Sequence, residues 1–219
     1  MAFSPYRKVL TTALDLHTLG YGVGRASMES QRPDIAALEE ALNAVERDAQ
    51  ALVAGLTPES GAWRPDAGSW SVAECLDHLA TANQVYLRAM QPAAERALAQ
   101  GRRRRGPARP GLVGGWFIRT LEPPVKSRLK QKAHQSIRPR PAVPLDDAAR
   151  EFFTSQNDVR AFLRRYADID LAGVRFPNPF IRGIRFSLAT GLHVIPAHER
   201  RHLWQAWRVR HAAERAVAA

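Results

Sequence analysis

Two histidines near the end of the chain have the spacing of metal ligands. His198 and His202 stand four residues apart in the stretch PAHERRHLWQAW. Residues four apart on a helix lie on the same face, so two imidazoles at this spacing can share one metal ion. With Glu199 between them, the pattern is H-E-x-x-H, which in zinc peptidases joins two metal ligands to a general base. The spacing alone leaves open a peptidase and a different kind of helical metal site.

The residues around these histidines indicate that both face a core. Apolar residues at intervals of three and four precede the pair and follow it, as expected for a helix that is buried along one side. In order, this stripe consists of Leu188, Leu192, Ile195, His198, His202, Gln205 and Val209. Gln205 comes one turn after His202, where its amide can orient a metal-binding imidazole or contact a bound ligand.

A third histidine lies in an earlier apolar stripe. His78 occupies a core position between Cys75 and Ala82. The core of a helical bundle is where facing helices build metal sites. A single core histidine is more often a hydrogen-bonded structural residue. Three imidazoles therefore indicate a metal site only if the two helices are neighbours and the rings lie at the same height.

Four helical segments are expected to position these side chains. Their apolar residues recur at helical intervals over about 33–52, about 71–92 with an extension to 100, about 144–170 and about 186–214. Ser71 followed by Glu74 is a capping box, which predicts the start of the second helix. Pro92 predicts a kink or an end of the same helix.

The lengths of the connections predict the path of the chain. Short loops join antiparallel neighbours, whereas the connection of about 40 residues between the second and third helices lets both run the same way. No period-2 run of useful length is present. We therefore predict an all-α fold, a four-helix bundle with an up-down-down-up path. The bundle is expected over 33–215, including a basic Pro/Arg-rich crossover at 101–144, after an N-terminal extension, 1–32, with a short amphipathic helix.

The positive charge of the chain belongs to this crossover. Residues 101–140 hold twelve Lys and Arg residues and one acid, Glu122, and these account for the net charge of +11. Such a segment predicts a weak contact with nucleic acid or an anionic surface through neutralisation of phosphates, and a solvated loop is the alternative. Its apolar part, GLVGGWFIRTLEPPV, indicates a short ordered piece packed on the bundle or against lipid.

The composition is ordinary for a globular protein. Of the 219 residues, 45% are hydrophobic and 24% are charged, and no apolar run approaches the roughly 20 residues that span a bilayer. Cys75 is the single cysteine, which excludes an intrachain disulfide and is compatible with a reducing compartment. We expect a cytoplasmic protein, and we retain a homodimer as an expectation about its assembly.

Two motifs resemble those of a known family. The stretch GLTPESGAWRPDAGSWSVAECLDHLATAN is similar to the opening of the DinB/YfiT-like superfamily, with its W-S-(V/I)-x-E-x-(L/V)-x-H-L pattern. The stretch HVIPAHERRHLWQAWR is similar to the closing H-x-x-x-H-x-x-Q helix of that superfamily. The matching residues are Trp70, Ser71, Glu74, His78, Leu79, His198, His202 and Gln205. The resemblance covers roughly residues 33–100 and 145–212 and leaves out the arginine-rich crossover.

The resemblance implies a four-helix bundle in which three histidines bind a divalent metal ion. Here these ligands would be His78, His198 and His202. Members of the superfamily include, or resemble, transferases that use low-molecular-weight thiols, thiol-dependent isomerases and the iron-binding part of sulfur-inserting enzymes. The resemblance therefore implies a site more strongly than it implies a reaction.

These observations lead us to expect a metal-dependent transferase or hydrolase that activates a thiol or water against a small-molecule substrate. Three imidazoles leave a coordination position open, as in catalytic metal sites. Zinc or nickel suits three nitrogen ligands, iron is the alternative, and a low-molecular-weight thiol is a further expected cofactor. Gln205, Glu199, Trp70 and Tyr86 are expected to support the ligands or line the pocket. The competing hypothesis is a non-catalytic metal-binding or interaction module whose crossover binds an anionic partner.

The peptidase hypothesis lacks a third ligand on the closing helix. The metzincin pattern would place glycine at position 205 and histidine at 208, where the chain has Gln205 and Arg208. A glutamate ligand would have to come from a further helix, and only Glu214 remains, on the same helix. We therefore expect the H-E-x-x-H match to be fortuitous.

Overall fold

The structure is a computed structural model that describes residues 32–124 and 133–217. The N-terminal extension, 1–32, with its expected short helix, lies outside the described residues, apart from residue 32. Apart from Pro33, the described helices and strands belong to one compact unit, Asp34–Ala219.

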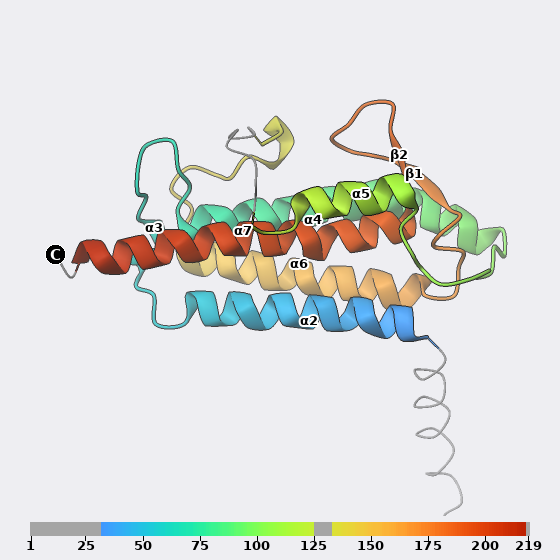
Figure 1. The fold of residues 1–219 in the computed structure, drawn as a ribbon, viewed down its shortest axis with the longest axis horizontal. Coiled ribbons are helices and arrows are strands. Elements are labelled where there is room, and N and C mark those ends of the chain that lie inside the picture. The colour runs from blue at the N-terminus through green and yellow to red at the C-terminus, as the bar shows by residue number, and fades with distance from the viewer. Residues whose placement is uncertain (1–31, 125–132, 218–219) are drawn as a thin grey trace, which may run out of the picture. The chain divides into compact units, whose positions relative to one another are not determined.

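Four long helices dominate this unit (Figure 1). They are α2 (Pro33–Val53), α4 (Val72–Ala99), α6 (Leu145–Tyr166) and α7 (Leu188–Val217). The shorter elements are α3 (Pro58–Ala62), α5 (Leu112–Leu121), the 3-10 helix η1 (Gln135–Ile137), and the strands β1 (Arg175–Pro177) and β2 (Arg185–Ser187). The prediction of a helical fold is confirmed, and the described sheet is one antiparallel pair in which Phe176 lies opposite Phe186.

Helix α4 is buried on all sides over its first turns. It starts at the predicted capping box, where Ser71 Oγ accepts from the Glu74 amide at 3.2 Å and the Glu74 carboxylate accepts from the Ser71 amide at 2.9 Å. Every residue from 71 to 80 is buried. The helix does not end at Pro92 but continues to Ala99, because Met90, Ala94 and their neighbours pack into the core on both sides of the proline.

Contacts along the helices define which ends lie together. On α4 and α6 they advance in the same order: Asn83 bonds Ser155, and Gln91 bonds Tyr166. On α2 and α7, Trp207 Nε1 donates to Asp48 at 2.9 Å. Three residues later, Arg210 donates to the carbonyl of Leu52 at 2.8 Å, so the ends of α2 and α7 are tied together.

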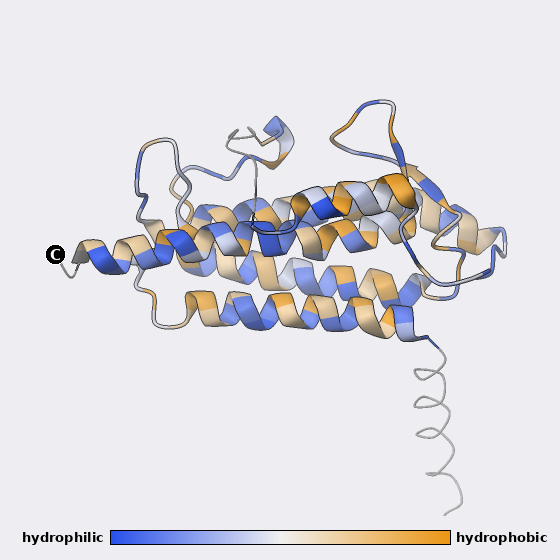
Figure 2. Ribbon diagram, viewed as in Figure 1, coloured by the Kyte–Doolittle hydropathy of each residue, from blue (hydrophilic) through white to orange (hydrophobic). Residues whose placement is uncertain are grey.

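The core lies between the apolar stripes of the long helices (Figure 2). One cluster of buried residues surrounds Tyr166, Phe176 and Leu188, and a second surrounds Leu76 and Phe152. No described helix combines the length and the apolar content that a bilayer-spanning segment needs.

The short ordered piece that the apolar residues of the crossover predicted is a helix in the structure. Helix α5 packs against α7. Gly114 makes the approach close, because a Cβ atom at this position would lie 2.5 Å from Thr190 Oγ1. Part of the arginine-rich stretch before α5 is also held by hydrogen bonds. Asp34 accepts from Arg104 Nη2 and from the Ala108 amide, both at 2.6 Å.

Candidate metal centre

The structure brings the three predicted imidazoles to one point. His78 comes from the buried half of α4, and His198 and His202 come from successive turns of α7. One ring nitrogen of each lies within 4.8 Å of the other two, and the Nε2 atoms of His78 and His198 are 3.3 Å apart. The ring centroids are separated by 4.4 to 5.1 Å. A single cation can bridge nitrogen atoms at these separations.

Hydrogen bonds on the far side of two rings assign their tautomers. His78 Nδ1 lies 2.5 Å from the carbonyl oxygen of Ile137, and His202 Nδ1 lies 3.2 Å from Oε1 of Gln205. A carbonyl oxygen can only accept, so Nδ1 carries the proton in both rings. The lone pair of each ring is therefore on Nε2, the atom free to bind a metal, as in many histidine metal sites.

Burial keeps these rings neutral. It lowers the pKa of His78 against the opposing effect of the bond to the Ile137 carbonyl, and it lowers the pKa of His202 well below the usual range. The pKa of His198 falls to about 3, because burial is reinforced by the nearby His78 and Arg201. Neutral imidazoles with converging lone pairs repel one another unless a cation lies between them. The three histidines therefore fit a divalent metal ion.

Two further predicted residues lie against the rings. Trp70, directly before the capping box, has its ring centroid 4.8 Å from that of His78 and 5.7 Å from that of His202. Gln205 is the acceptor for His202. The indole thus covers one side of the histidine cluster, and the amide fixes the orientation of one imidazole.

The other two predicted residues, Glu199 and Tyr86, contact side chains outside the histidine cluster. Glu199 is fully buried, and its Oε1 accepts from Asn83 Nδ2 at 2.7 Å and from Gln156 Nε2. Burial raises the pKa of its carboxyl to about 8. The ring of Tyr86 packs on those of Phe176 and Phe180, and burial raises the pKa of its hydroxyl.

The cluster contains no carboxylate or thiolate among the described residues. Cys75 is fully buried in the apolar core, and burial raises the pKa of its thiol far above the usual range. Glu199 directs its carboxylate to α4 and α6, where Asn83 and Gln156 bind it. The arrangement that a zinc peptidase needs, with this glutamate as the base beside the metal, is therefore not present.

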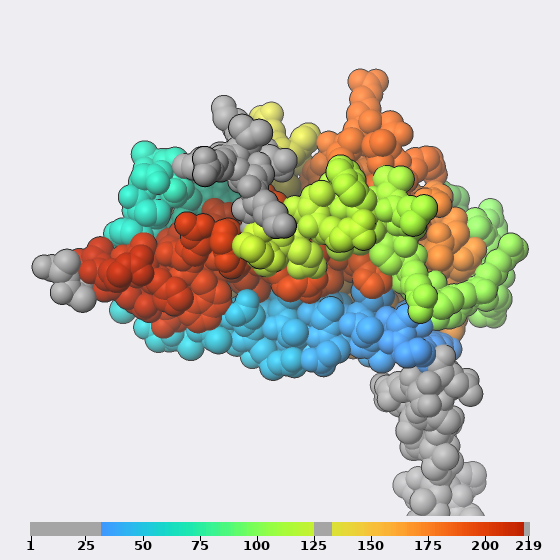
Figure 3. Space-filling view, in the orientation of Figure 1, coloured from blue at the N-terminus to red at the C-terminus, as the bar shows by residue number. Residues whose placement is uncertain are grey.

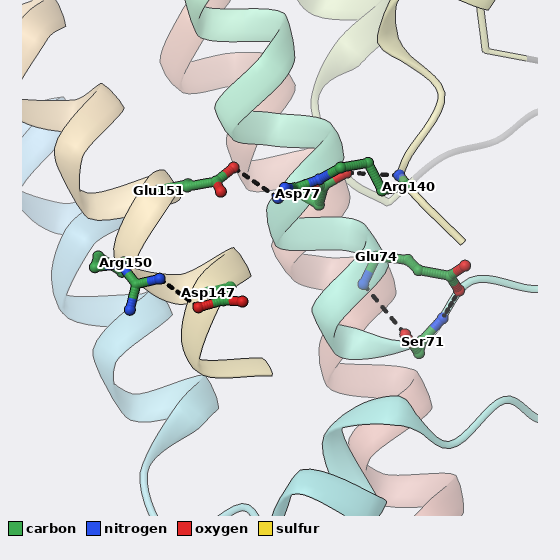
Figure 4. A network of polar contacts seen from close by, with 7 residues as sticks. All are labelled: Ser71, Glu74, Asp77, Arg140, Asp147, Arg150 and Glu151. Atoms are coloured by element: carbon green, nitrogen blue, oxygen red, sulfur yellow. Dashed lines mark hydrogen bonds and ion pairs between the residues drawn. The ribbon is translucent and has the colours of Figure 1, made fainter. Parts of the chain in front are cut away.

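An ion pair that the sequence did not predict supports His78 from the crossover (Figure 4). Asp77, the residue directly before His78, is only 1% exposed. Its carboxylate accepts from the Arg140 amide at 2.7 Å and from Arg140 Nε at 2.8 Å. Arg140 also donates to Glu151 on α6. The carbonyl that orients His78, that of Ile137, lies three residues before Arg140 and is held in place by this anchor.

The Asp77→Asn protein should bind divalent metal about tenfold to a hundredfold more weakly than the wild type, because groups that orient a ligand typically contribute this much. The carboxamide cannot accept from both Arg140 donors, so Ile137 loses its fixed position. Competition with a chromogenic chelator measures the change. Glu151→Gln is the matched control, because it removes only the exposed end of the same network. Equal affinities of Asp77→Asn and wild type would show that the anchor does not act on the site.

The protein is of the class of helical bundles with a candidate metal centre. Two of its four long helices contribute the three histidines. The model of the DinB superfamily matches residues 41–206, three quarters of the chain, and the protein belongs to that superfamily. The resemblance seen in the two sequence motifs is thereby confirmed. Comparisons with curated proteins and with solved structures give no significant match.

Proposed function

We propose that this protein is a metal-dependent transferase or hydrolase that acts on a small molecule, with a thiol or water as the nucleophile. The observation that carries the proposal is the set of three neutral imidazoles from His78, His198 and His202, which no further described His, Cys, Asp or Glu residue joins. Three ligands with a position left for substrate or water are typical of catalytic sites, whereas structural sites are closed by four protein ligands.

A divalent cation held by the three imidazoles would supply Lewis acidity and lower the pKa of a thiol or water at its open position. The residues of the chain prepare the site for this chemistry. The Ile137 carbonyl and Gln205 keep the lone pairs of His78 and His202 directed at one point. Trp70 covers two of the rings and excludes water from that side. Zinc or nickel suits this donor set, and iron is the alternative.

In this proposal the four long helices follow an up-down-down-up path. The contacts of α4 with α6 and of α2 with α7 support this path. On this path α4 and α7 are antiparallel neighbours. His78, near the start of α4, therefore lies level with the middle of α7. The close approach of Gly191 to Met90, at the other end of the same pair, agrees with it.

The test is a turnover assay with tag-free protein loaded separately with zinc, nickel or iron. A chromogenic aryl halide with a low-molecular-weight thiol reports transfer, and an activated ester reports hydrolysis. We expect metal-dependent turnover that falls at least about a hundredfold in His202→Ala, since a metal-activated nucleophile is lost. Equal rates in His202→Ala and wild type would contradict the proposal. Stoichiometric metal binding without turnover would favour a non-catalytic binding module.

A further inference from the structure

Large apolar side chains are exposed at two neighbouring elements. On the described surface six such side chains are exposed, and five of them lie on α5 or in the turn between β1 and β2. Those on α5 are Leu112, Val113 and Trp116, which are 95%, 70% and 60% exposed. Those in the turn are Ile181 and Ile184, each 40% exposed. Contiguous apolar exposure of this kind marks an interaction surface.

Helix α5 is apolar on two sides and turns one apolar stripe, that of Leu112, Val113 and Trp116, away from the bundle. Its inner face is formed by Gly114, which is buried against α7, and by Ile118 and Leu121, which pack against the core. The exposed residues lie on the opposite face at helical spacing. Figure 3 shows α5 on the surface beside α7. The helix is therefore held by one apolar face and presents a second one outward.

The β1–β2 turn lies next to this helix. The ring centroids of Phe117 on α5 and Phe186 on β2 are 5.3 Å apart. Figure 1 shows both elements on the same side of the bundle. Gly183, with a φ of 83°, allows the tight reversal between Ile181 and Ile184. We call the exposed apolar residues of α5 and of this turn, together with Arg119 of α5 and Arg182 and Arg185 of the turn, the apolar–basic face.

The charge of this face has a single sign. Residues 101–121 contain six arginines and no acid, and the turn 178–185 contains two arginines and no acid. Arg102 and Arg104 pair with Asp170 and Asp34. The remaining arginines are exposed and have no carboxylate within 4.0 Å among the described residues. Arg119, Arg182 and Arg185 belong to the apolar–basic face, and Arg103, Arg105 and Arg109 belong to the stretch before α5.

This combination fits one occupant best, a lipid bilayer with anionic headgroups. Leucine, valine and isoleucine gain free energy from burial at the acyl boundary, and tryptophan favours the interface itself. Single-stranded nucleic acid requires aromatic stacking platforms, and Trp116 is the one aromatic residue among the five exposed side chains. Pairing with a second copy of the same face would bring like charges together, which is unfavourable.

We propose that the apolar–basic face is a peripheral binding site for anionic bilayers. Leu112, Val113 and Trp116 enter the boundary between headgroups and acyl chains, Ile181 and Ile184 add to this contact, and the unpaired arginines bind lipid phosphates. The site is independent of the histidine cluster, so a failure of the proposed catalytic function would leave it unaffected.

Co-sedimentation of the full-length protein with vesicles tests this proposal. We expect binding to vesicles of phosphatidylglycerol and phosphatidylcholine that weakens with salt, and little binding to pure phosphatidylcholine. The triple variant Leu112→Ser, Val113→Ser, Trp116→Ser should lower the partition coefficient at least about tenfold, because the inserted apolar area is lost. Arg119→Gln and Arg182→Gln should each lower it by up to about fivefold.

Two matched controls distinguish binding at this site from nonspecific adsorption to vesicles. Leu98→Ser changes the sixth exposed apolar side chain, on α4, and should leave the partition coefficient unchanged. Arg164→Gln removes an exposed arginine from α6 with a smaller effect than Arg119→Gln. Circular dichroism establishes that each variant is folded. The dependence of wild-type vesicle binding on salt and on anionic lipid tests the proposal without any variant.

Outcomes of three kinds would overturn the proposal. The first is equal binding to anionic and neutral vesicles, or binding that the triple variant leaves intact. The second is retention by single-stranded RNA without vesicle binding, which would assign the face to nucleic acid. The third is a dimer in sedimentation velocity that the triple variant dissociates, again without vesicle binding, which would assign the face to self-association.

Discussion

The His78→Ala protein is expected to bind a divalent cation more than about a hundredfold more weakly than the wild type. Loss of a group that only orients a ligand already costs up to about this factor, and His78 would contribute a ligand atom itself. It is also the ligand that joins the two helices, since His198 and His202 both belong to α7. Chelator competition with zinc and with nickel measures the affinity of each protein.

A matched control for this prediction lies on the same helix as the other two ligands. His193 is half-buried on α7, and its Nε2 lies 3.1 Å from the Ala108 carbonyl, outside the histidine cluster. His193→Ala should keep wild-type metal affinity, and His202→Ala should lose it as His78→Ala does. The three-histidine site is wrong if His78→Ala and His193→Ala bind metal equally well.

The second large effect is expected on stability, at Glu199. Glu199→Ala should lower the free energy of unfolding by about 2 to 3 kcal/mol, because two buried donors, on Asn83 and Gln156, lose their acceptor. Glu199→Gln should stay within about 1 kcal/mol of the wild type. The carboxamide retains one oxygen acceptor, and its amino group can donate to Gln156 Oε1, a buried atom without a partner among the described residues.

Urea unfolding of the metal-free proteins measures both effects. Glu214→Ala is the control, because it removes an exposed glutamate of the same helix, whose ion pair with Arg210 is screened by solvent. A Glu199→Gln protein as unstable as Glu199→Ala would contradict the hydrogen-bonding role. Glu199→Gln also tests the peptidase alternative. If Glu199 were the general base of a peptidase, this variant would lose activity and still bind metal.

The sequence was most informative where short-range rules apply. The capping box at Ser71 and Glu74 predicted the start of α4, because two residues three apart complete it. The apolar stripe of the closing helix predicted that His198 and His202 share a face. That His78 reaches them depends on which helices are neighbours, so the sequence indicated this only through the family resemblance.

Features that depend on the crossover were not predictable in this way. Nothing adjacent in the sequence indicates what covers Asp77. In the structure Arg140, 63 residues away, buries it and forms its ion pair. For Pro92 the sequence left open a kink, an end or an extension to about residue 100. The helix continues to Ala99, because packing on both sides of the proline outweighs the lost backbone hydrogen bond.

The H-E-x-x-H match shows how one spacing can serve two structures. Adjacent residues on a helix point about 100° apart, so Glu199 need not face the same partner as His198. In this bundle the side of α7 that carries Glu199 meets Asn83 of α4 and Gln156 of α6. The amide partners on those helices, and not the motif, decide what the glutamate does.

The most direct test of the metal centre is X-ray absorption spectroscopy on tag-free protein loaded with one equivalent of zinc. The account predicts three imidazole nitrogen atoms at about 2.0 to 2.1 Å, completed by a light atom from solvent or substrate. The histidine shell should lose one imidazole in His78→Ala. A sulfur ligand, a shell made of carboxylates, or an unchanged histidine count in His78→Ala would contradict it.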